Sequence, residues 1–133
     1  MEPMKIYFPG GKRVDASFKG FTIKTDQSEK FGGEASEPEP YSLFMASIAT
    51  CAGIYVLGFC QKRNIPTEAI TLEQSWERNK EGKMTTLTID IKVPPSFPEK
   101  YHSALVRSAN LCAVKKTMEN PPEFLVQTVV TGD

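Results

Sequence analysis

A run of twenty residues without a charge, Tyr41 to Cys60, constrains the fold more than any other feature of this chain. It reads YSLFMASIATCAGIYVLGFC, and its apolar side chains cover nearly every face of a helical wheel. A helix that is apolar all round is either the buried core of a domain or a membrane span. The hydroxyl side chains inside the run, together with Gly53 and Gly58, make it a poor span. We therefore predict a central core helix and no membrane partner.

Length and composition narrow the class of protein further. A chain of 133 residues suits one compact core, so residues 1–133 are predicted to form a single domain. Charged residues make up 24% and the net charge is zero, which gives no indication of nucleic acid as a partner. The first residues, MEPMKIYFPGG, hold no apolar stretch long enough for a signal peptide, so we expect a cytoplasmic location.

Short apolar or alternating runs on both sides of the central helix predict strands. Three before it form a meander and two after it form an antiparallel hairpin with one buried face; these runs are residues 5–8, 14–18, 21–25, 70–77 and 86–93. A polar loop, residues 26–40, leads into the helix, and its last residue, Pro40, suits a first helical turn.

Two short helices and a last strand are predicted after the hairpin. Ser96 and Glu99 form a potential capping box for a helix through Ala109. Asn110 can cap a second helix that begins near Leu111, and residues 124–130 are predicted to form a strand. The order of elements predicts an α+β domain with antiparallel sheets packed on helices.

Three cysteines are the candidates for chemistry. Cys51 and Cys60 are nine residues apart on one helix, about 13 Å along its axis, which is too far for a disulfide. Cys60 is interpreted as a small apolar core residue. If Asn110 is the cap, Cys112 lies at the second helical position, where backbone N–H groups favour a thiolate. From these residues alone, Cys51 is either an inert core cysteine or a reactive one.

The segment from Pro40 to Cys51 resembles the central helix of the OsmC/Ohr family. That family has a proline, a leucine pair, small residues and a cysteine, followed by a basic and an aliphatic residue, here Lys62 and Ile65. Its second cysteine, before a short helix and a terminal strand, matches Cys112 in the sequence NLCAV. The order of the elements agrees over almost the whole chain.

The resemblance implies a fold and an activity. It implies an intertwined homodimer with antiparallel sheets around a long central helix, and a thiol peroxidase that reduces organic hydroperoxides and sometimes hydrogen peroxide. Cys51 would be the peroxidatic thiolate that becomes a sulfenic acid, and Cys112 would be the resolving thiol. An external dithiol would regenerate the pair in oxidative stress defence.

The chain also departs from the family pattern. In the peroxidases a glutamate after the helix-start proline pairs with an arginine from a Gly-Gly-Arg turn, whereas Tyr41 follows the proline here. The turn reads Gly-Gly-Lys12-Arg13, so Arg13 is the candidate cation for activating Cys51. Its alternative interpretation is a charged hairpin tip. Ala113 replaces the usual proline after the second cysteine.

Other kinds of site find little support in the sequence. His102 is the only histidine, and the cysteines do not have zinc-ligand spacing, so no metal or other cofactor is expected. The main alternative to a peroxidase is a non-catalytic module of the same fold that binds a small apolar ligand in the dimer cleft near Cys51. A third is a structural dimer with inert thiols.

Overall fold

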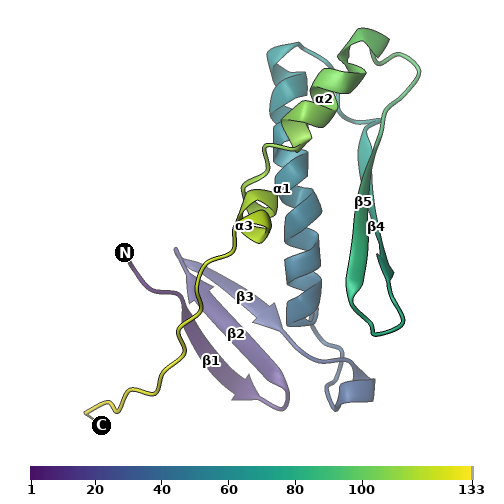
Figure 1. Cartoon of the computed structure of the whole chain (residues 1–133). Helices are drawn as coiled ribbons and strands as arrows, with labels where there is room; N and C mark the ends of the chain where they lie inside the picture. Colours follow the sequence, from purple (N-terminus) through teal and green to yellow (C-terminus); the bar gives the residue numbers. More distant parts are fainter. Residues whose placement is uncertain (133) are drawn as a thin grey trace. The chain divides into compact units, whose positions relative to one another are not determined.

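The computed structural model describes residues 1–132 and divides into two compact units, Met1–Ser47 and Ile48–Asp133, with the boundary inside the central helix. Antiparallel sheets and a long helix make it a mixed α+β structure, as predicted (Figure 1). The prediction of a single domain over residues 1–133 stays a prediction, and the two units are described separately.

The first unit contains the predicted three-stranded meander. Its strands pair antiparallel in the order β1-β2-β3 and span Lys5–Gly10, Arg13–Phe18 and Phe21–Thr25. Ile6 pairs with Ala16, which pairs with Ile23, so three apolar residues share one face of the sheet. The short β-prone runs separated by turn residues therefore predicted this sheet correctly.

The loop after β3 is held by the buried carboxylate of Asp26, which is 1% exposed. It accepts hydrogen bonds from the N–H groups of Gln27 (2.7 Å), Ser36 (3.1 Å) and Glu34 (3.3 Å), and from the Ser36 hydroxyl (2.6 Å). Glycine is required at position 33, where the loop passes close to the backbone of Gln27, because an added Cβ would lie 2.0 Å from the Gln27 carbonyl oxygen. A short 3₁₀ helix, η1 (Glu29–Phe31), lies within the loop.

The central helix, α1, spans Pro40–Lys62 and contains the whole uncharged run. It ends as predicted before Pro66: Asn64 adopts a positive φ of 55° and the Ile65 N–H bonds the Cys60 carbonyl at 2.9 Å. By length and composition α1 could cross a membrane, and 33% of its most apolar window is buried. The core helix of a soluble protein meets the same criterion.

In the second unit a two-stranded hairpin lies beside α1 (Figure 1). Strands β4 (Thr71–Arg78) and β5 (Met84–Lys92) pair antiparallel, as the period of two predicted. A core cluster joins the C-terminal half of α1 to the hairpin and to the helix that follows; its buried members are Val56, Phe59, Cys60, Phe97 and Leu105. Trp76 pairs with Leu87 near the turn of the hairpin, and its side chain is 44% exposed.

The helix after the hairpin begins later than predicted. A short 3₁₀ helix, η2 (Glu99–Tyr101), leads into α2 (His102–Ala109), and neither has a side-chain cap. The predicted capping box at Ser96 is therefore wrong: Pro98 is the N-cap residue of η2. Leu105, 2% exposed, anchors α2 in the core cluster.

The last helix, α3, spans Ala113–Glu119, and no further helix or strand follows within the described residues. The predicted strand at residues 124–130 is therefore wrong. Its apolar side chains are 71% to 96% exposed. A strand needs a neighbouring strand to satisfy its backbone N–H and C=O groups. A sequence with high strand propensity does not by itself provide that neighbour.

Candidate functional site

Cys51 lies in the middle of α1, partly exposed and surrounded along the helix by uncharged residues. Ile48 is on the same face one turn earlier, and Ala52 follows it, buried at 3% exposed. Since α1 has no charged side chain before Lys62, no ionic partner for Cys51 comes from its own helix. Its environment depends on other elements of the second unit.

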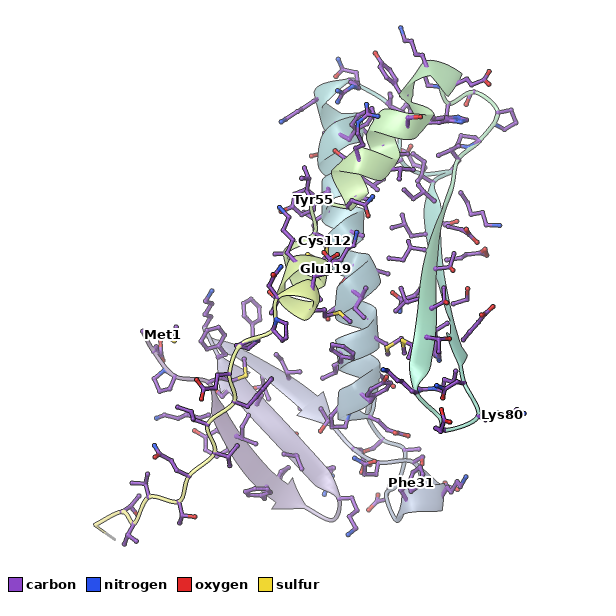
Figure 2. All side chains as sticks on the ribbon, in the orientation of Figure 1. Met1, Phe31, Tyr55, Lys80, Cys112 and Glu119 are labelled. Carbon is purple, nitrogen blue, oxygen red and sulfur yellow. The ribbon has the colours of Figure 1, made fainter. Side chains whose placement is uncertain are left out.

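Cys112 is the N-cap residue of α3 and is almost fully buried, at 1% exposed. Its sulfur accepts a hydrogen bond from the Lys115 N–H at 3.4 Å and donates to the Ile48 carbonyl at 3.8 Å. The second of these contacts fixes Cys112 over the turn of α1 that precedes Cys51. Figure 2 labels Cys112 beside α1, at the start of α3.

The predicted position of Cys112, inside the first turn of a helix capped by Asn110, is two residues out of register. Asn110 instead ends α2, where its N–H bonds the Val106 carbonyl at 3.1 Å. Its side chain accepts a hydrogen bond from the Lys115 ammonium at 2.7 Å. Because Asn110 is already used as a C-cap, the next helix begins at Ala113 and the thiol of Cys112 takes the capping role.

The start of α3 also controls the acidity of Cys51. The pKa of Cys51 is lowered by hydrogen bonds from the Val114 N–H, which has the largest effect, from the Cys112 thiol and from the Ala113 N–H, while burial opposes them. Hydrogen bonds that donate to a thiolate favour the ionised form. The structure therefore brings Cys51 and Cys112 together, and the groups around Cys51 favour its ionised form.

Cys60 has the opposite environment. It is 0% exposed, belongs to the core cluster, and has its pKa raised by burial, with the positive charge of Arg63 acting in the other direction. The Arg63 guanidinium stacks on the Phe59 ring, 3.6 Å from its centroid. The interpretation of Cys60 as an apolar core residue is confirmed.

A cavity of about 890 Å³ adjoins Cys112 within the second unit. Its walls come from α1, β5, α2 and α3, and most of its lining is apolar, including Ile48, Ile89 and Val106. Cys112 lies in its wall, with Lys115 beside it. A site of this size and character suits an organic molecule with a substantial apolar part.

Arg13 begins β2 in the first unit, and its Nε donates a hydrogen bond to the Gly10 carbonyl at 3.3 Å. This bond within the turn fits the alternative interpretation, a charged hairpin tip. The action of Arg13 on Cys51 stays a prediction, since the two residues lie in different units.

Sequence reasoning did not find the backbone donors of Ala113 and Val114. Backbone N–H groups carry no sequence signature of their own, so only the start of α3 could have revealed them. A prediction that α3 begins at Ala113, and not near Leu111, would have identified the first-turn N–H groups, which have no partners within the helix.

The model of the family described as OsmC-like protein matches residues 33–127, which include both cysteines of the pair. The chain belongs to the OsmC-like family. This agrees with the resemblance carried by the central helix and by the second cysteine. No curated protein sequence matches the chain.

Solved structures share the fold of this OsmC-like protein. A putative osmotic stress induced and detoxification response protein from Psychrobacter arcticus is 20% identical, with 88% of each chain covered and a TM-score of 0.72. An OsmC-like protein of unknown function from Vibrio cholerae is 12% identical, with a TM-score of 0.61 over 88% of this chain and 94% of that one. An organic hydroperoxide resistance protein OsmC from Legionella pneumophila is 19% identical, with a TM-score of 0.53 over 89% and 90%.

Proposed function

We propose that this OsmC-like protein is a thiol-dependent peroxidase that reduces organic hydroperoxides, and hydrogen peroxide as a smaller substrate, in oxidative stress defence. The observation that carries the proposal is the contact between Cys51 and Cys112 at the start of α3, which lowers the pKa of Cys51. The thiolate is the nucleophilic form of cysteine, so this contact selects Cys51 as the attacking residue. The name of the Legionella relative, which records organic hydroperoxide resistance, agrees with this class of substrate.

The reaction has two steps on the protein. The Cys51 thiolate attacks one oxygen of ROOH, the O–O bond breaks, and RO⁻ leaves and takes up a proton as the alcohol, so that Cys51 becomes a sulfenic acid. Cys112, as a thiolate, then attacks the Cys51 sulfur, and the hydroxyl group leaves as water when it is protonated. The resulting disulfide is reduced to two thiols by an external dithiol, which is itself oxidised.

The position of Cys112 suits the resolving role. Its sulfur already hydrogen-bonds to Cys51, and its contact with the Ile48 carbonyl holds it beside the reacting turn of α1. A resolving thiol that is buried and in place limits further oxidation of the sulfenic acid, because condensation competes with attack on a second peroxide.

The working form of the peroxidase is proposed to be a cytoplasmic homodimer. Large apolar side chains are exposed in each unit, including Phe8 at 82% and Phe21 at 72% on the sheet, and Ile54 at 65% on α1. The apolar segment at residues 124–130 is exposed as well and has no strand neighbour among the described residues. Exposed large apolar side chains of this kind are typical of protein surfaces that bind a partner.

The cavity beside Cys112 favours a second candidate function. Its volume of about 890 Å³ and largely apolar lining suit a non-catalytic module that holds a small apolar ligand. The two functions differ in one respect: only a peroxidase consumes the thiol pair when it meets a hydroperoxide.

The test is therefore a stoichiometric reaction with an organic hydroperoxide such as cumene hydroperoxide, followed by peptide mapping. We expect a disulfide between Cys51 and Cys112 while Cys60 stays free. Cys51→Ser should abolish peroxide reduction, whereas Cys112→Ala should permit one oxidation of Cys51 and then over-oxidation. If Cys51 stays fully alkylatable after the treatment, the binding module becomes the better interpretation.

A further inference from the structure

Helix α3 receives little support from tertiary packing. It has seven residues, Ala113–Glu119, and none of them is buried. Helices shorter than about 12–15 residues are marginal in water, so their end contacts decide whether they persist. For α3 the contacts at its N-terminal end are made by sulfur atoms.

The two sulfurs together satisfy the first N–H groups of α3. The Cys51 sulfur accepts hydrogen bonds from the N–H groups of Ala113 and Val114. The Cys112 sulfur accepts one from the Lys115 N–H at 3.4 Å. These are among the donors that no carbonyl within the helix can reach. Cys112 also donates its own proton to the Ile48 carbonyl at 3.8 Å, which ties the start of α3 to α1.

Oxidation alters both sulfurs at once. In the proposed reaction the hydroperoxide takes two electrons from the pair, a sulfur–sulfur bond forms, and the products are an alcohol and water. The disulfide carries no thiol proton, so the single proton of Cys112, which faces both Cys51 and the Ile48 carbonyl, is lost. It carries no negative charge either, and N–H groups bond a neutral acceptor about half as strongly as a charged one.

We propose that the disulfide between Cys51 and Cys112 loosens the first turn of α3, which makes this helix a redox-sensitive switch. With the hydroperoxide as oxidant, the switch rests on the proposed function. Lys115, Met118 and Glu119 of α3 line the cavity, so loosening of α3 alters the cavity wall. Figure 2 labels Glu119 and Cys112 at the two ends of this helix. Loosening also uncovers Cys112, 1% exposed in the reduced protein, for the dithiol that regenerates it.

Amide hydrogen exchange of the full chain tests the switch. In the disulfide form, exchange at Lys115, Lys116 and Thr117 should be at least fivefold faster than in the reduced form, because exchange reports local opening. Amides of β4 and β5 provide the internal reference and should keep their protection. Equal exchange of the α3 amides in the two forms would overturn the proposal.

Two arms separate this inference from the proposed function. The disulfide is formed with cumene hydroperoxide in one arm and with diamide, a general thiol oxidant, in the other. If only diamide forms it and α3 then loosens, the peroxidase proposal fails and the switch stands. Cys112→Ser keeps a good N-cap residue but forms no disulfide, so its α3 amides should not respond to diamide. A response equal to that of the parent protein would refute the switch.

Discussion

Replacing Ala113 by proline removes one hydrogen-bond donor from Cys51 with little disturbance of the fold. Ala113 is the first residue of α3, the helical position that accepts proline best, since its N–H has no partner within the helix. The residue before a proline must be extended, and Cys112 already has a ψ of 124°. Ala113→Pro therefore deletes the N–H that bonds Cys51 while it leaves the Cys112 thiol and the Val114 N–H in place.

The expected magnitude follows from the strength of that bond. A hydrogen bond to a charged group contributes roughly 1.5–3 kcal/mol, and the contribution of Ala113 is the smallest of the three that favour the Cys51 thiolate. Because Cys51 is also partly exposed, we take about 1 kcal/mol, which is roughly a fivefold change in the thiolate population. The pKa of Cys51 should rise in Ala113→Pro.

The assay is the rate of Cys51 alkylation by iodoacetamide as a function of pH, followed by peptide mapping. At pH values below the pKa of Cys51 the variant should react about fivefold more slowly than the parent, and above it the two rates should converge. Ala113→Ser retains the N–H and is the matched control. A pH profile identical to that of the parent would refute the role of the Ala113 N–H, and a uniform loss at every pH would indicate misfolding instead.

Three further substitutions test the activation of Cys51 and the packing of each unit. If Arg13 is the activating cation, Arg13→Ala should raise the pKa of Cys51 and slow its reaction with hydroperoxide at neutral pH. Lys12→Ala is the control. Equal, small effects of the two substitutions would show that Arg13 belongs to a solvated hairpin tip. Asp26→Asn should lower the thermal midpoint at neutral pH, since hydrogen bonds from Ser36 lower the pKa of Asp26 to about 2. Because the pKa of Asp26 is lowered on folding, the stability that its ionised carboxylate provides is present above pH 4 and is lost as the pH falls toward 2. The thermal midpoints of parent and variant should therefore converge in acid. Leu105→Ala should cost about 2–5 kcal/mol in urea unfolding, and a loss below about 1 kcal/mol would contradict its place in the core cluster.

The amino-acid sequence by itself determined the local elements of this protein. Absence of charge over Tyr41 to Cys60 is a property of adjacent residues, and it predicted α1 almost to its ends. Alternation with a period of two likewise predicted the hairpin, because side chains of a strand point to opposite faces in turn. Short β-prone runs between turn residues predicted the meander. The family resemblance singled out Cys51 and Cys112 from the motifs around them.

Tertiary structure decided which groups meet. Cys51 and Cys112 are 61 positions apart, and their contact depends on how α3 packs on α1, which no local pattern encodes. The same holds for the capping role of Cys112, which follows from the use of Asn110 to end α2. Residues 124–130 have the composition of a strand, yet a strand exists only where a neighbour accepts its backbone hydrogen bonds. Short-range pattern fixes the conformation of a segment, whereas acidity, capping and strand pairing depend on groups that only the folded chain brings into contact.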